Sequence, residues 1–265
     1  MYRVIRLAFW MALLCAPGAG CATLAKKPPS PAAEISPQEA ATLTARPGER
    51  YYILVFGSQS SPKRAKYTHT WATVVRVTDR AELAEPTLEE QTISWMPATL
   101  EIRPLARHPE KGVNLGLHFT IQEMLKHEER VAVWGPYEIG PGLYHRFLVQ
   151  KQFMESGQIG YQCIDSIGES ARKGNGCDCI HAVTDMDPQF SRSQYPLMYF
   201  GESGSRHVVR ELHKRPIIIG PNHDHSWLFA KLELCRYPLD RRTYTGRTVE
   251  NTPQSLNAVL QQSEK

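Results

Sequence analysis

The chain has 265 residues, of which 42% are hydrophobic and 22% charged, and its formal net charge is +4 at pH 7. That length suits one well-filled domain or two small ones, and the composition is that of a globular protein. The net charge is mild, and the one notable basic run, residues 63–66, is more typical of a solvated loop than of a nucleic-acid-binding surface. We therefore expect no nucleic-acid partner.

The N-terminus has the layout of a secretory signal peptide. Two arginines precede an apolar stretch from Leu7 to Ala16, which is too short to span a bilayer. The sequence Gly-Ala-Gly-Cys, which ends at Cys21, resembles the cleavage box of bacterial lipoproteins. This predicts a signal peptide at residues 1–20 and a lipid, such as palmitate, on Cys21; secretion without lipid is the alternative. The protein is then expected in the bacterial cell envelope, bound to a membrane through its lipid and facing the periplasm or the exterior.

Residues 21–48 are predicted to form a flexible tether, because they contain five prolines and few bulky side chains. A short helix is predicted to start at Ser36, which is followed by a proline and by a capping-box glutamate. The folded domain is expected at residues 49–245, and residues 246–265 are expected to form a C-terminal tail.

Strands come first in the folded part. Aromatic and β-branched residues predict strands at 51–59 and 68–78, and a third at 91–105 that Pro97 breaks. Short connections favour antiparallel pairing of these strands. Further on, the pattern predicts the following elements: a helix from Thr120 to about Arg130, an extended segment at 131–139, a helix at 142–157, a short strand or turn at 159–167, a helix at 177–186, and strands at 216–220 and 226–239. The predicted fold class is α+β, an antiparallel sheet with packed helices.

The predicted helix at 177–186 carries two cysteines and a histidine. Cys179 shares the apolar side of this helix with Ala182 and Val183, whereas Cys177 and His181 share the more polar side. His181 is therefore poorly placed to act as a base for Cys179. The start of a helix lowers the pKa of a thiol and favours a nucleophile there. The alternative is that Cys179 is only a small buried hydrophobic residue.

Two motifs resemble one family. The segments Tyr-Thr-His-Thr-Trp-Ala-Thr-Val-Val-Arg-Val, from Tyr67, and Asn-Gly-Cys-Asp-Cys-Ile-His-Ala-Val, from Asn175, are similar to those of circularly permuted papain-like hydrolases, the NlpC/P60 superfamily branch that includes lecithin-retinol acyltransferase-like enzymes. The resemblance implies a permuted papain-like fold in which His69 is the general base, Cys179 the nucleophile and His181 a structural companion. The chain departs from the family at Cys177, where asparagine is usual. Gln91 can hydrogen-bond an imidazole and is our candidate for the third, orienting residue.

The predicted function is a cysteine hydrolase or acyltransferase that acts on amide or ester bonds of cell-wall peptides or lipids and needs no cofactor or metal. A non-enzymatic, tethered binding or scaffold lipoprotein is the alternative. A zinc-binding protein is a further alternative, because His223 and His225 would share a strand face and Cys177, Cys179 or His181 would complete the site.

The remaining polar residues have simpler interpretations. Asp185 and Asp187 suggest calcium less well than they suggest helix-end capping. His108 and His118 are expected in loops or at the surface. Since an exported protein permits disulfides, Cys177 is a candidate to pair with Cys163.

Overall fold

The structure is a computed structural model that describes residues 31–34, 39–40, 43–79, 85–166, 170, 173–191, 200–244 and 254–256. The predicted signal peptide, the lipidation site at Cys21 and most of the tether and tail lie outside the described residues, as does the predicted helix start at Ser36. Among the described helices, none is long and apolar enough to cross a membrane.

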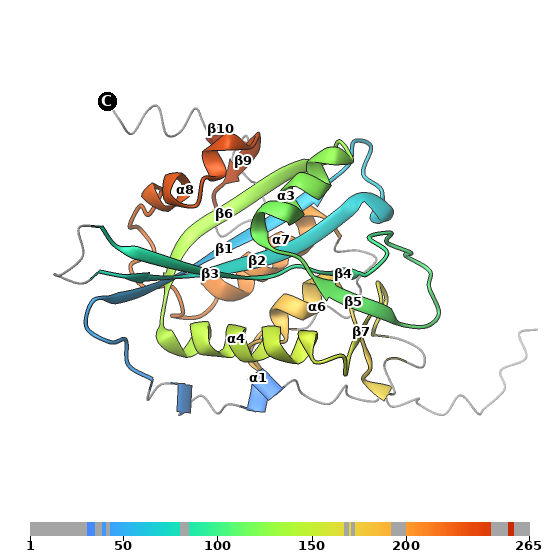
Figure 1. The fold of residues 1–265 in the computed structure, drawn as a ribbon, viewed down its shortest axis with the longest axis horizontal. Helices are drawn as coiled ribbons and strands as arrows, with labels where there is room; N and C mark the ends of the chain where they lie inside the picture. The colour runs from blue at the N-terminus through green and yellow to red at the C-terminus, as the bar shows by residue number, and fades with distance from the viewer. Residues whose placement is uncertain are drawn as a thin grey trace, which may run out of the picture.

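The domain mixes strands and helices along the chain (Figure 1). In chain order the strands are β1 (Glu49–Gln59), β2 (Thr68–Thr78), β3 (Thr87–Ile93), β4 (Trp95–Pro97), β5 (Glu110–Asn114), β6 (Arg130–Ile139), β7 (Gly160–Tyr161), β8 (Gly176–Cys177), β9 (Leu239–Arg242) and β10 (Gln254–Ser255). The helices are α1 (Pro31–Glu34), η1 (Ala65–Tyr67), α3 (Leu117–Lys126), α4 (Pro141–Glu155), α6 (Cys179–Thr184), α7 (Glu202–His213), α8 (Trp227–Lys231) and η3 (Leu234–Arg236).

The strands form two sheets. The larger has the order β10-β9-β6-β1-β2-β3, and the smaller has the order β4-β5-β7-β8. Most neighbours are antiparallel, and β6–β9 and β7–β8 are the parallel pairs among the described strands. This confirms the predicted α+β class. The predicted third strand is divided, because β3 belongs to the larger sheet and β4 to the smaller one.

The long hairpin of β1 and β2 is the centre of the core. Its residues are mostly β-branched or aromatic, which favours extended backbone, and the two strands pair from Glu49↔Thr78 to Gln59↔Thr68. Side chains alternate between the two faces of each strand. Phe56 and Trp71 are register partners whose rings stack with centroids 5.2 Å apart, and they mark one face of the sheet.

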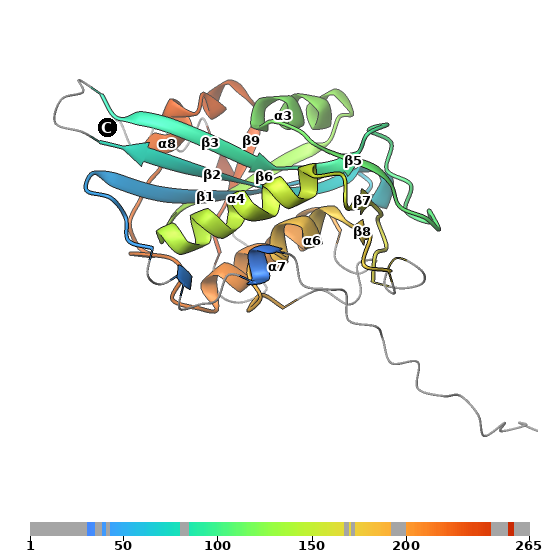
Figure 2. The ribbon, with the colours of Figure 1, turned by 60° about the horizontal axis from the view of Figure 1, so that its bottom comes forward.

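Helices cover both faces of the larger sheet. Figure 2 shows α3 on one side, and α6 and α7 on the other. Phe56 and Trp71 point to the α3 side, on which Tyr52 also packs against Trp227 of α8. On the opposite face Thr70 hydrogen-bonds Ser205 of α7 at 2.9 Å. The two faces of β2 therefore meet different helices, and this decides which residues can form a site together.

Three sequence predictions about elements are wrong. Residues 226–239 form α8 and η3 rather than a strand, because Leu228 and Leu232, four residues apart, both turn into the core. The helix predicted from Thr120 begins at Leu117, and the Thr120 hydroxyl donates to the Gly116 carbonyl 2.9 Å away. Residues 216–220 form a turn with one isolated bridge, Ile139↔Ile218.

Candidate functional site

The segment from Cys177 to His181 starts with the end of a strand and continues into α6. Cys177 lies in β8 opposite Tyr161 of β7, and α6 begins two residues later at Cys179. The helix is capped by Asp178, whose carboxylate oxygen Oδ1 accepts a hydrogen bond from the His181 backbone N–H at 2.7 Å. This N-cap satisfies a donor that the first turn would otherwise leave without a partner.

His181 lies between two carboxylates. Its Nδ1 atom is 2.7 Å from Asp165 Oδ1 and 3.0 Å from Asp178 Oδ2. All three side chains are buried, with at most 4% of any of them exposed. Their oxygen and nitrogen atoms lie within 4.8 Å of one another, and no other group of three or more potential metal ligands of this kind occurs in the described part of the chain.

The carboxylates dominate the electrostatics of His181. Burial by itself lowers the pKa of the imidazole, but the charges and hydrogen bonds of Asp165 and Asp178 outweigh burial and raise it to about 10. Without another cation, the imidazole is therefore protonated near neutral pH.

Asp178 Oδ2 is the second carboxylate oxygen beside His181. It is buried, and its contact with His181 Nδ1, at 3.0 Å, is an ion pair. The Nδ1 atom also makes a hydrogen bond with Asp165. Together the three side chains bring two carboxylate oxygens and an imidazole nitrogen to one buried point, which is a ligand set of the kind that holds a metal ion.

Two thiols near the trio, Cys163 and Cys179, are not activated. All four cysteines of the described residues are free thiols, so the suggested pairing of Cys177 with Cys163 is not present. Burial and the Asp178 charge raise the pKa of Cys179 well above its usual range, although the Thr70 backbone makes a hydrogen bond that lowers it. The expected lowering at the helix start is therefore outweighed, and Cys179 is a neutral thiol near neutral pH.

His69 does not reach this thiol. It opens β2 as predicted, but its ring stacks on Trp71 at 5.3 Å and thus lies on the α3 face, whereas α6 and Cys179 pack on the Thr70 face. The Nε2 atom of His69 is 2.9 Å from Ser94 Oγ, and Nδ1 makes no hydrogen bond. The predicted hydrogen-bonded pair of Cys179 and His69 is absent from the structure.

Gln91 does not orient the His69 imidazole. It pairs in register with Val74, which is five residues along β2 from His69. Residues an odd number of positions apart on a strand point to opposite faces, so Gln91 and His69 lie on opposite faces of the sheet. Ser94 occupies the role that Gln91 was expected to have, because its hydroxyl is the hydrogen-bond partner of the ring.

The other candidate ligands are used elsewhere. His223 and His225 have ring centroids 6.2 Å apart, and His225 lies 3.6 Å from Glu138. Asp187 forms a buried ion pair with Arg146 at 2.8 Å and accepts a hydrogen bond from the Gln189 backbone N–H, which agrees with capping rather than calcium binding.

The two histidines expected in loops or at the surface differ from each other. His108 is exposed in a loop, as expected. His118 is instead in α3, where its ring nitrogen lies 3.1 Å from the Tyr237 hydroxyl.

Sequence reasoning missed two of the three clustered residues. Asp178 had a signal, because an aspartate directly before a helix and three residues before a histidine is placed both to cap the helix and to face that histidine. Asp165 had none in its own neighbourhood. The parallel pairing of β7 and β8 brings its segment to α6, which lies more than ten residues away in sequence.

Iodoacetamide is expected to alkylate Cys179 near neutral pH no faster than it alkylates a free cysteine in solution, because the raised pKa keeps the thiol protonated. The rate is also expected to be unchanged in His69→Gln, whose side chain is on the other face of the sheet. Timed labelling followed by peptide mass spectrometry measures both rates. Faster labelling of Cys179 that disappears in His69→Gln would restore the catalytic pair.

Comparisons with protein-family models, with curated proteins and with solved structures find no match for this chain. The functional argument therefore rests on the geometry of the site.

Proposed function

We propose that this protein binds one divalent transition-metal ion, with Zn²⁺ as the best match, through Asp165, Asp178 and His181. The observation that carries the proposal is the buried trio itself, in which two carboxylate oxygens and an imidazole nitrogen lie within 4.8 Å of one another. Imidazole nitrogen and carboxylate oxygen are common zinc ligands. A divalent ion carries the charge that balances two carboxylates.

The distances support this proposal. The Nδ1 atom lies 2.7 Å and 3.0 Å from the two carboxylate oxygens. Ligands of a tetrahedral zinc ion are about 3.3 Å apart when the metal–ligand bonds are about 2.0 Å. Shifts of a few tenths of an ångström in each side chain would therefore accommodate the ion. The cap bond between Asp178 Oδ1 and the His181 N–H already fixes the orientation of one ligand, as outer-shell hydrogen bonds do in known sites.

The buried position supports a structural role for the ion. Catalytic zinc sites keep an open position for water or substrate, whereas these three ligands are closed off from solvent. An ion here would tie the segment that follows β7 to the start of α6. Zinc usually takes four ligands, and Cys163 is a candidate for the fourth, because both Asp165 and Asp178 lie close enough to contribute to raising its pKa.

This proposal replaces the expectation of an enzyme without metal. A cysteine hydrolase needs a base at its nucleophile, and no imidazole of the described residues hydrogen-bonds Cys179. Export and lipidation at Cys21 remain proposals that the N-terminal sequence supports. The protein would then be a tethered, metal-stabilised binding or scaffold domain of the cell envelope.

Metal binding is tested by titrating the chelator-treated protein with Zn²⁺, Co²⁺, Ca²⁺ and Mg²⁺ in a calorimeter. We expect one Zn²⁺ per chain and no comparable binding of Ca²⁺ or Mg²⁺, which prefer sites of six or more oxygens or several waters. Asp178→Asn is the sharpest variant, because asparagine still caps the helix but loses the charged ligand; it is expected to weaken zinc binding at least about tenfold.

His223→Gln is the matched control, since it removes a histidine that is outside the trio. Its zinc affinity is expected to equal that of the unmodified chain. The absorption spectrum of the Co²⁺ form reports the fourth ligand, because a thiolate adds a charge-transfer band that Cys163→Ser would remove. Equal zinc binding by Asp178→Asn and the unmodified chain, or no zinc binding at all, would contradict the proposal.

A further inference from the structure

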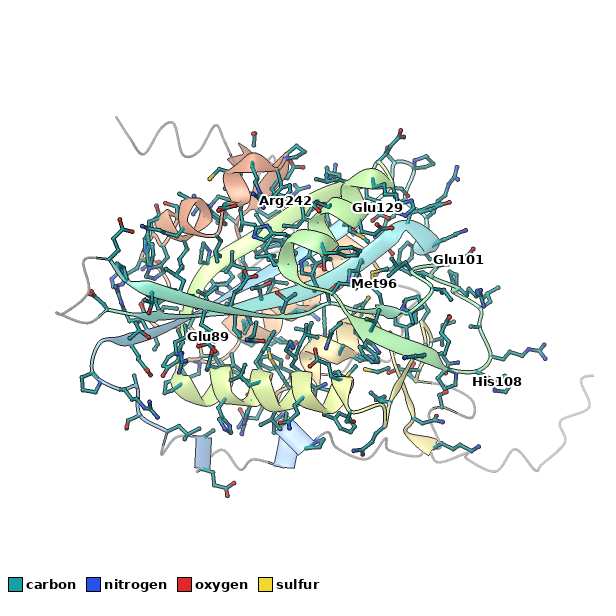
Figure 3. The ribbon with its side chains drawn as sticks, viewed as in Figure 1. Glu89, Met96, Glu101, His108, Glu129 and Arg242 are labelled. Atoms are coloured by element: carbon teal, nitrogen blue, oxygen red, sulfur yellow. The ribbon has the colours of Figure 1, made fainter. Side chains whose placement is uncertain are left out.

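A second site candidate lies on the other face of the larger sheet, between η1, β4 and the end of α3. Here the side chains enclose a cavity of about 430 Å³. Cavities that bind small ligands usually have volumes in this range. Figure 3 labels three of the lining residues, Met96, Glu101 and Glu129, and the lining includes no member of the trio at α6. The cavity is thus separate from the trio at α6.

The charges that line the cavity are paired except for one. Glu101 lies 3.1 Å from Lys66, and Glu123 lies 3.6 Å from Lys126 and 3.1 Å from His127. Glu129 has no ion-pair partner among the described residues. Once the paired charges are set aside, the cavity keeps one negative charge, which favours a ligand with a single positive charge.

Glu129 is held as a binding group would be. The side chain is buried, with only 4% of the residue exposed, and its Oε2 atom accepts a hydrogen bond from Ser58 at 2.6 Å. The other oxygen, Oε1, accepts none from the described residues. Ser58 in turn belongs to β1, in the centre of the sheet, so the carboxylate is anchored on a rigid element. Burial also raises the pKa of Glu129, which shows that its charge is poorly solvated.

The rest of the lining is apolar. Met96 and Met124 line the cavity and are each 2% exposed, and Ile102 lines it and is 5% exposed. Methionine side chains adapt to ligands of irregular shape. The ring of Tyr67 is also part of the lining, and the Lys66 ammonium lies over it, 5.5 Å from the ring centroid. A bare metal ion would gain nothing from this apolar surface, whereas an organic cation would.

We propose that this cavity binds a small organic ammonium ion, with the ammonium group on Glu129 Oε1 and its carbon chain against Met96 and Met124. The proposal is independent of the metal site. The chemical class is a primary alkylamine or the end of a lysine-like side chain, because a carboxylate accepts hydrogen bonds from an –NH₃⁺ group and the methionines cover an aliphatic chain of a few carbons.

The probe is n-pentylamine, with pentan-1-ol as a neutral analogue of similar size and pentanoate as an anionic one. Calorimetric titration of the full chain is expected to give a dissociation constant of roughly 1 mM for the amine and at least about tenfold weaker binding for the two analogues. Glu129→Gln keeps an acceptor for Ser58 and is expected to weaken amine binding at least about tenfold. Glu101→Gln, which alters a paired glutamate of the same cavity, is expected to change it less than about twofold.

Methyl NMR of methionine-labelled protein gives a second measurement that needs no variant. The methyl signals of Met96 and Met124 are expected to shift on addition of the amine, and those of methionines elsewhere are not. Equal binding of the amine by Glu129→Gln, or of pentan-1-ol by the unmodified chain, would overturn the proposal. So would the absence of any amine binding or methyl shift up to about 50 mM, since a preformed site for this ligand should bind more tightly.

Discussion

Replacing His181 with leucine is expected to lower the free energy of unfolding by about 3–5 kcal/mol. The imidazole is 2.7 Å from one buried carboxylate and 3.0 Å from another, so its removal takes away a cation that pairs with both. Denaturant unfolding at neutral pH measures the change. Because this loss is a large part of the 5–15 kcal/mol typical of a domain, His181→Gln provides a second, milder variant.

A rescue variant separates the effect of the buried carboxylate charges from the effect of lost packing. Replacing Asp165 and Asp178 with asparagine in the His181→Leu chain removes both carboxylate charges and keeps the cap of α6. This triple variant is expected to recover most of the lost stability, because replacing all members of a buried charged group costs less than removing one. An unfolding free energy of His181→Leu within about 1 kcal/mol of the unmodified chain would contradict the prediction.

Treatment with a chelator distinguishes a trio of side chains that holds a metal ion from one that holds none. If the trio holds zinc, a chelator should lower the midpoint of thermal unfolding of the unmodified chain, and added zinc should restore it, since a ligand that binds only the native state stabilises that state. The same treatment should leave His181→Leu unchanged. The rescue result tests the buried charges, and the chelation result tests the metal.

The sheet could be predicted because its signal is local. The runs of aromatic and β-branched residues in β1 and β2 specify extended backbone without help from the rest of the chain. The strand predicted at 226–239 failed for the opposite reason. Its apolar residues fit both a strand and a helix, and the packing of Leu228 and Leu232 into the core decides for α8 and η3. The helix α7 was missed although Val208, Val209 and Leu212 share its buried side.

The predicted catalytic pair depended on which face of β2 carries the His69 side chain. Successive residues of β2 face opposite sides of the sheet, so a shift of one position moves a side chain from one set of helices to the other. Thr70, and not His69, is the residue of β2 that interacts with Cys179. The motif places the histidine in the expected strand. Which face of that strand packs against α6 depends on the three-dimensional packing, and the motif does not contain that information. Asp165 likewise reaches α6 through strand pairing that the sequence does not show.

His69 is expected to make the protein sensitive to mild acid. Burial lowers the pKa of its imidazole from 6.5 to about 3. Between these two values the unfolded chain binds a proton that the folded chain does not, so the contribution of His69 to stability is fully present above about pH 6.5 and is lost as the pH falls towards 3. The upper limit of the loss is about 5 kcal/mol, from about 1.4 kcal/mol for each pH unit.

The test is the free energy of unfolding between about pH 4 and pH 7, compared for the unmodified chain and His69→Gln. Glutamine places an amide N–H near the position of Nε2 and keeps the hydrogen bond to Ser94, but it cannot be protonated in this range. The variant is therefore expected to be less stable at pH 7 and to have a clearly smaller loss of stability on acidification. His145→Gln, which changes an exposed histidine of α4, is the control for replacing a histidine elsewhere in the chain. An equal slope in His69→Gln would show that the acid sensitivity comes from other groups. A smaller slope would establish His69 as a buried, neutral core residue, because the folded protein can give the protonated ring no acceptor for its Nδ1–H.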